Sequence, residues 1–164
     1  MTGKELRRIG WGAYGVALLL IAIPLLDTII SIWPLRVGDV TWRFGAVGLS
    51  SRAVMTPLLG LVVGLATAII MQHRVAVRTF AVLGFVGAVL ALVAMGFFTL
   101  DALQTRAQVR PEASGAFDTA SAMALFKLLA GFVVALLLGI GGWRAGRKRR
   151  GVAGAGAADE GSML

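Results

Sequence analysis

Residues 21–30 read Ile-Ala-Ile-Pro-Leu-Leu-Asp-Thr-Ile-Ile, and a single carboxylate, Asp27, lies among their apolar side chains. The stretch belongs to an apolar run over residues 11–32, which is about the 20 residues that a helix needs to cross a bilayer. A charge at membrane depth costs at least a few kcal/mol, so it usually has a partner or a function. Only one other ionisable residue lies well inside an apolar run, and it is basic: Lys127, within residues 122–143.

Four apolar runs make this chain more hydrophobic than a soluble domain. Hydrophobic residues form 58% of its 164 residues, against roughly 45–50% in soluble proteins. The runs cover residues 11–32, 54–71, 79–100 and 122–143. The sequence therefore predicts an all-α integral membrane bundle of four transmembrane helices, in a single domain over residues 1–150. The Gly/Ala-rich segment 151–164 is expected to be a disordered cytoplasmic tail, because it buries too little apolar surface to fold alone.

The net charge is +8. Apart from Lys127, the basic residues lie in the connections and near the two termini rather than in the apolar runs. Loops that stay in the cytoplasm carry an excess of Lys and Arg. We therefore predict a multi-pass protein of the cytoplasmic (inner) membrane, with both termini inside. No basic–aromatic interleaving of a base-stacking kind occurs, so nucleic acid is not an expected partner. This topology places ten basic residues inside (Lys4, Arg7, Arg8, Arg74, Arg78, Arg144, Arg147, Lys148, Arg149 and Arg150) and five outside (Arg36, Arg43, Arg52, Arg106 and Arg110).

The connection between the first two runs, residues 33–53, has an amphipathic pattern. One interpretation is a segment on the membrane surface that buries Trp42, Phe44 and Val47 while Arg43 faces water. The other is an irregular surface loop. The sequence does not distinguish the two.

Asp27 and Lys127 each lie about five residues from the outer end of their helix, roughly 7 Å at 1.5 Å per residue. In one interpretation they form an ion pair between the first and fourth spans. In the other, Lys127 extends to the headgroups alone, and Asp27 reaches water or the hydroxyl of Thr28 or Ser31. Both interpretations fit the sequence.

Small residues recur at four-residue spacing in two of the runs. Such stripes let helices approach closely where lipid supplies no hydrophobic driving force. A basic cluster follows the last run, and it either binds anionic lipid headgroups or holds that end of the helix inside. The stripes consist of Gly60, Gly64 and Ala68 and of Gly131, Ala135 and Gly139, and the cluster consists of Arg144, Arg147, Lys148, Arg149 and Arg150.

The chain contains few of the residues that catalysis and cofactor binding require. It has no cysteine, which excludes disulfides, thiolate metal sites and covalent c-type haem. Its one histidine, His73, lies in a short basic connection. No zinc-protease motif, phosphate-binding glycine loop or pair of intramembrane carboxylates occurs. We therefore expect no catalytic residue, no metal and no cofactor, and we predict that the protein is not an enzyme.

These features predict a non-catalytic accessory or scaffolding subunit that packs within a larger membrane complex. Its expected partners are the lipid bilayer and either other membrane proteins or further copies of itself. The alternative is a small transporter in which Asp27 and Lys127 line a polar path.

Short motifs in the first half of the chain add a resemblance. Leu25-Leu26-Asp27 is followed by Pro34, Asp39 and Trp42, and then by Arg52 and Pro57-Leu58-Leu59-Gly60. Over residues 10–68 this order resembles the small membrane proteins associated with hormogonium polysaccharide. The resemblance implies a membrane component linked to polysaccharide secretion, and it carries over no catalytic residue.

Overall fold

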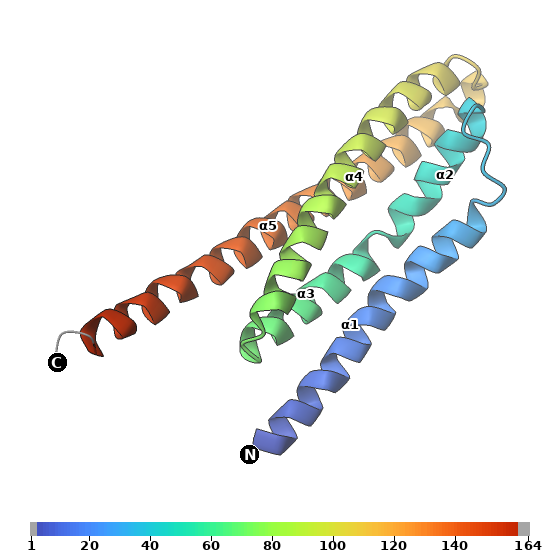
Figure 1. The fold of residues 1–164 in the computed structure, drawn as a ribbon. Coiled ribbons are helices and arrows are strands. Elements are labelled where there is room, and N and C mark those ends of the chain that lie inside the picture. The colour runs from blue at the N-terminus through green and yellow to red at the C-terminus, as the bar shows by residue number, and fades with distance from the viewer. Residues whose placement is uncertain (1–2, 161–164) are drawn as a thin grey trace.

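The computed structural model describes the backbone of residues 3–160, and the side chains of that range except at residues 3, 4, 6, 7, 52 and 148–160. Within the described range every regular element is a helix (Figure 1), which confirms the predicted all-α class. In chain order the elements are α1 (Gly3–Ser31), α2 (Val40–Ala53), α3 (Met55–Ile70), α4 (Arg74–Arg106), the short 3-10 helix η1 (Pro111–Ala113) and α5 (Ser114–Glu160).

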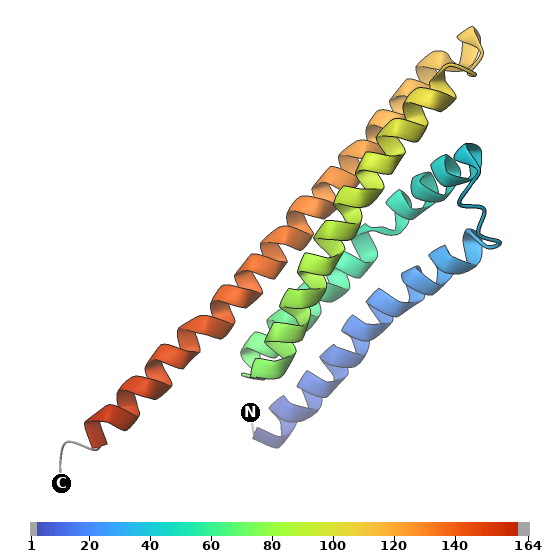
Figure 2. The ribbon, with the colours of Figure 1, turned by 45° about the horizontal axis from the view of Figure 1, so that its top comes forward.

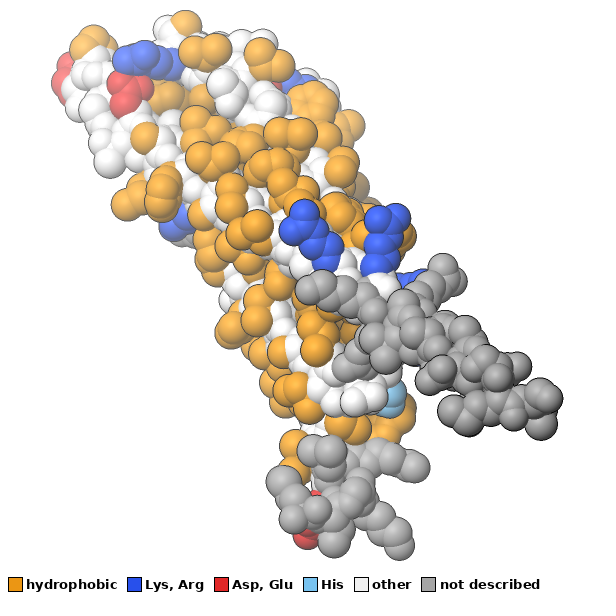
Figure 3. All heavy atoms as spheres, turned by 90° about the vertical axis from the view of Figure 1, so that its left-hand side faces the viewer, with side chains coloured by type: hydrophobic (Ala, Val, Ile, Leu, Met, Phe, Trp, Pro, Cys, Tyr) orange, Lys and Arg blue, Asp and Glu red, His pale blue; other side chains and the backbone are white. Residues whose placement is uncertain are grey.

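Three of the helices, α1, α4 and α5, are each long and apolar enough to cross a membrane. Helices α2 and α3 meet at a bend of 44° and pass the same test only together, as one broken span or a re-entrant segment. Figure 3 shows apolar side chains over the middle of one face, with acidic and basic side chains together toward one end. The chain is therefore an all-helical protein with three or four helices suited to a bilayer, whereas the predicted number of four and the orientation stay predictions.

The segment predicted as either an interfacial strip or an irregular loop forms helix α2. Asp39 caps it, because its carboxylate accepts a hydrogen bond of 2.9 Å from the backbone N–H of Thr41. The helix packs along α4 and α5 and continues through the bend into α3. The loop prediction is therefore wrong. The interfacial orientation also changes, because Phe44 stacks on rings of α4 and α5 instead of entering lipid.

The antiparallel pair of α4 and α5 is the centre of the bundle, and α1 lies at its edge. Helix α3 packs on both α4 and α1, while α1 packs along α2 and α3 and touches α4 through the ring of Tyr14. Figures 1 and 2 show this order, with the α4–α5 hairpin extending beyond the end of α1. The buried residues between the helices are mostly small or aliphatic: Leu58, Leu61, Ala88 and Ala135 in one cluster, and Leu65, Ala68 and Val77 in another.

The last part of α5 differs from the sequence prediction. The helix continues to Glu160, so residues 151–160 are helical where a disordered tail was expected. Its four alanines favour a helix and its three glycines disfavour one, so the segment is helical mainly as the continuation of a helix that the apolar span has already nucleated. Residues 161–164 lie outside the described residues.

Candidate functional site

Asp27 lies on α1, four residues before the helix ends at Ser31. Its side chain is exposed, and within the described part of the chain it makes no hydrogen bond and no ion pair. The neighbouring hydroxyl of Thr28 donates to the carbonyl oxygen of Pro24 at 2.7 Å, so it is not directed to the carboxylate. Large apolar side chains surround the acid on the same helix, with Leu26 58% and Ile30 72% exposed. Asp27 is therefore a carboxylate presented on an apolar outer surface.

Lys127 lies on α5 and lines a cavity of about 370 Å³ between α2, α4 and α5. It is half-buried and has no ion-pair partner among the described residues. It is the only charged residue of the lining, which otherwise consists of Phe44, Gly45, Gly48, Leu49, Ser51, Phe98, Ala120, Met123 and Ala124. The cavity is therefore apolar, with one basic group at its edge.

The ion pair predicted between Asp27 and Lys127 is not formed within the described chain. The two residues lie on α1 and α5, and these helices do not touch, because α2 and α3 lie between them. The sequence suggested their matching depth but not the order of the helices around the bundle, which separates them.

The two residues nevertheless lie at a similar level along the bundle. Gly60 of α3 packs against residues 17–21 of α1, and Asp27 lies six to ten residues beyond that contact, roughly 9–15 Å away. Ser51, which lines the cavity together with Lys127, lies nine residues beyond Gly60 toward the same end, a distance of about the same size. Both charges are therefore near the level of the bend between α2 and α3.

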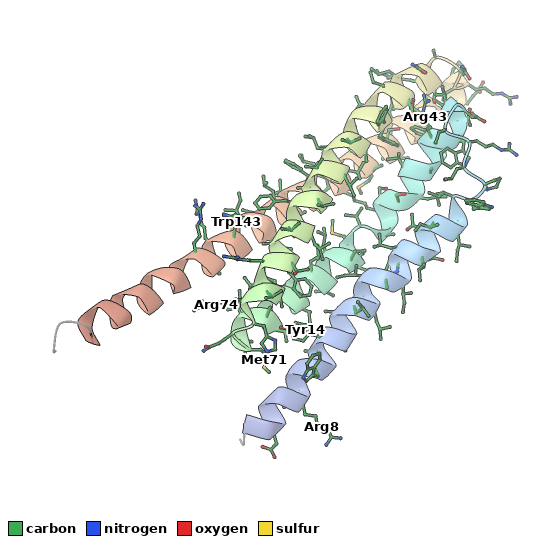
Figure 4. All side chains as sticks on the ribbon, viewed as in Figure 1. Arg8, Tyr14, Arg43, Met71, Arg74 and Trp143 are labelled. Atoms are coloured by element: carbon green, nitrogen blue, oxygen red, sulfur yellow. The ribbon has the colours of Figure 1, made fainter. Side chains whose placement is uncertain are left out.

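The ion pair that does form inside the bundle joins Arg43 of α2 to Asp101 of α4. The guanidinium donates from Nε to Oδ2 at 3.1 Å and from Nη2 to Oδ1 at 2.9 Å, while Nη1 donates to the carbonyl oxygen of Val37 at 3.0 Å. The Asp101 side chain is 3% exposed. Figure 4 shows Arg43 beside α4, near the α4–α5 end. Arg43 therefore pairs with a buried acid while 32% of its side chain stays exposed, where one interpretation of the sequence had it face water alone.

Aromatic rings adjoin this ion pair and fix α2 in the same place. The ring of Phe44 stacks on Phe98 with centroids 4.9 Å apart and on Phe117 with centroids 5.3 Å apart. Phe98 is 1% exposed. One signal in the sequence points to this pair. Opposite charges follow two apolar segments that end on the same predicted side of the membrane.

At the opposite end of the bundle, Tyr14 holds α1 against the turn between α3 and α4. Its hydroxyl oxygen lies 3.3 Å from Nδ1 of His73, and the two share a hydrogen bond. Its ring also stacks on Phe80, with centroids 6.3 Å apart. Figure 4 shows Tyr14 and Met71 close together at this end. The contact with Tyr14 therefore gives His73, the one histidine of the chain, a structural role.

The small residues of the two stripes lie where helices of the same chain meet. A Cβ added at Gly60 would lie 2.9 Å from the carbonyl oxygen of Ala17, and one added at Gly64 would strike the ring of Phe80. Ala68 and Ala135 are 0% and 1% exposed. In the second stripe, a Cβ at Gly131 would lie 2.6 Å from Val54 Cγ1, and one at Gly139 would lie 2.9 Å from Phe85 Cδ1.

The basic cluster begins on α5 at the end of the bundle that also holds the N-terminus (Figure 1). Arg144 is exposed, and the guanidinium carbon of Arg147 lies 5.9 Å from the ring centroid of Trp143. Arg78, Trp143, Gly146 and Arg147 line a cavity of about 280 Å³. The side chains of Lys148, Arg149 and Arg150 lie outside the described residues. The described residues contain no group of three or more His, Cys, Asp or Glu that could hold a metal ion.

The helices together indicate an α-helical membrane protein, defined by its apolar spans. No protein-family model matches the chain, and neither a curated protein nor a solved structure matches it. The resemblance of residues 10–68 to the membrane proteins associated with hormogonium polysaccharide stays a prediction.

Proposed function

We propose that this chain is a non-catalytic accessory subunit of a larger assembly in the cytoplasmic membrane, and that α1 is the helix that packs against the partner. The observation that carries the proposal is Asp27, whose carboxylate stands on an exposed apolar surface without a polar partner in the described part of the chain. A charge at that depth costs a few kcal/mol unless it is paired. A partner that supplies a polar or basic group there removes much of this cost.

The apolar surface around Asp27 is suited to a membrane partner but does not by itself require one, because lipid covers apolar side chains equally well. The small-residue stripes carry no part of the proposal, since the residues at Gly60 and Gly131 already contact neighbouring helices of the same chain. The carboxylate is the feature that the apolar chains of lipid do not satisfy. It therefore distinguishes a subunit of an assembly from a helical bundle surrounded by lipid alone.

The basic end of α5 supports a position at the membrane surface. Arg147 lies over Trp143, and aromatic and basic residues are typical of membrane–water interfaces. We propose that Arg144 and Arg147 contact anionic lipid headgroups, at about 1 kcal/mol for each basic residue near the surface. These contacts would anchor the end of the span and leave the opposite side of the bundle to the partner.

The test is whether assembly depends on Asp27. Purified in a mild detergent, the native chain is expected to migrate in a stoichiometric complex larger than one chain. Asp27→Asn is expected to shift most of it to the size of a single chain, since a buried charge pair across an interface contributes strongly to its lifetime. Glu112→Gln is the matched control, because this exposed acid lies in η1, outside the apolar spans. A native chain that migrates as a single monodisperse copy would contradict the proposal.

A further inference from the structure

We infer that the group that pairs with Asp27 is Lys127 of a second copy of this chain; the inference rests on the proposed function and names its partner. The two residues carry opposite charges inside apolar segments, and neither has an ion-pair partner within the described part of its own chain. A second copy supplies to each residue the one group that it lacks.

The level of the two residues makes this pairing possible between copies that share one orientation in the membrane. Both lie near the bend between α2 and α3, as the contacts of Gly60 and the lining of the cavity show. Two copies that stand side by side therefore present Asp27 and Lys127 at a common depth. No tilt or vertical shift of one copy against the other is needed to bring the charges together.

The arrangement of the helices allows Asp27 and Lys127 to meet only between two chains. Helices α1 and α5 do not touch within one chain, so an internal pair would require repacking of the bundle. Asp27 is exposed on the outer surface of α1, and Lys127 lines a cavity that reaches the surface of α5. The surface of α1 from one copy can therefore meet the cavity of the next without any change in either chain.

The cavity is also chemically suited to α1. Its lining is apolar apart from Lys127 and Ser51, whose hydroxyl donates to the carbonyl oxygen of Gly48, and it includes the large side chains Phe44, Leu49 and Met123. The side chains that flank Asp27, Leu26 and Ile30, are apolar and more than half exposed. An α1 helix placed over the cavity would cover apolar surface with apolar surface and bring one acid to one base. The contact joins two different surfaces, so it is heterologous, and repeated contacts of this kind close into a ring or extend into a chain.

Reversal of the charges gives the first test. Asp27→Lys and Lys127→Asp are each expected to weaken self-association about tenfold or more, because each places like charges together. Two differently tagged chains, one with each substitution, are expected to associate again when they are produced together, since every acid then faces a base. The double variant Asp27→Lys/Lys127→Asp is expected to self-associate as the native chain does. Failure of both the mixture and the double variant would overturn the inference.

Cysteine cross-linking gives the second test and does not depend on charge. The native chain has no cysteine, so each introduced thiol is unique. The thiols are placed beside the pair so that both charges stay: Ile30 lies one turn from Asp27, and Met123 lines the cavity one turn from Lys127. A chain with Ile30→Cys and a differently tagged chain with Met123→Cys are expected to form, under a mild oxidant, a disulfide-linked product that carries both tags. The matched control replaces Met123→Cys by Val93→Cys, at an exposed position on α4, and is expected to give no such product.

The outcomes separate this inference from the proposed function. If assembly requires Asp27 but the thiol at position 30 cross-links to a different protein, the second copy is the wrong partner and the proposed function stands. If no assembly depends on Asp27, both are wrong. Circular dichroism of each variant in detergent checks that the helices persist, so that loss of association is not loss of folding.

Discussion

Asp27 on α1 and Asp101 on α4 are both carboxylates on long apolar helices, but they differ in burial and in hydrogen bonding. Asp101 is 2% exposed and accepts two hydrogen bonds from Arg43. Asp27 is exposed and accepts none within the described part of the chain. A buried carboxylate needs a partner in the same chain for the fold to form. An exposed carboxylate inside a membrane span can instead pair with a group from another chain.

The helices that carry the two acids show the same contrast. Of the most apolar window, 17% is buried in α4 and 28% in α5, but only 6% in α1. The α4–α5 hairpin therefore has its packing inside the chain, whereas α1 turns most of its surface outward. The difference predicts that substitutions in the hairpin affect folding more than substitutions on α1 do.

The largest effect is expected from removing the partner of Asp101. Arg43→Met leaves the carboxylate of Asp101 buried without a partner, and breaking a buried pair in this way costs about 3–5 kcal/mol. The double variant Arg43→Met/Asp101→Leu is expected to recover much of that loss, because neither charge then remains inside. The free energy of unfolding, measured by adding SDS to mild-detergent micelles, checks both variants.

Arg106→Met is the control for that comparison. Arg106 pairs with Asp118 at 2.7 Å, but both side chains are well exposed, at 60% and 45%. An exposed pair contributes about 0–1 kcal/mol, so this substitution is expected to change the free energy of unfolding little. An equal loss for Arg43→Met and Arg106→Met would mean that Asp101 does not need its partner.

The sequence predicted the helices well but not the pairing of their charges. Apolar length identifies α1, α4 and α5 regardless of what surrounds them. Helix α2 was harder, because its sequence fits both a surface segment and an irregular loop, and its packing on Phe98 involves a distant part of the chain. The Arg43–Asp101 pair joins residues 58 positions apart. Hydropathy gives the depth of a residue but not which helices are neighbours, so the sequence left the pairing of Asp27 with Lys127 open.

A second, intermediate effect is expected where α4 and α5 approach most closely. A Cβ added at Gly84 would lie 2.9 Å from the carbonyl oxygen of Ala135 and 2.9 Å from the backbone nitrogen of Gly139. Because backbone atoms cannot move aside as side chains do, Gly84→Ala must separate the two helices, at about 1–3 kcal/mol by analogy with overpacked cores. The same unfolding measurement checks the loss.

Gly15→Ala is the matched control on α1. An added Cβ there meets nothing within 4 Å, and alanine favours a helix over glycine by up to about 1 kcal/mol. This substitution is therefore expected to leave stability unchanged or to raise it. A loss as large as that of Gly84→Ala would show that α1 is packed as tightly as the hairpin, and the contrast between the two regions would be wrong.

The smallest effect on folding is expected at Asp27 itself. Its side chain has no hydrogen-bond or ion-pair partner within the described chain, so Asp27→Asn is expected to change the free energy of unfolding of the single chain by no more than about 0.5 kcal/mol. The measurement uses enough detergent to keep the copies apart, because association would otherwise add its own free energy to the fold. The same substitution is expected to abolish most of the assembly at lower detergent. A large loss of stability in the separated chain would mean that Asp27 acts within the bundle, as Asp101 does, and would leave α1 without its distinguishing feature.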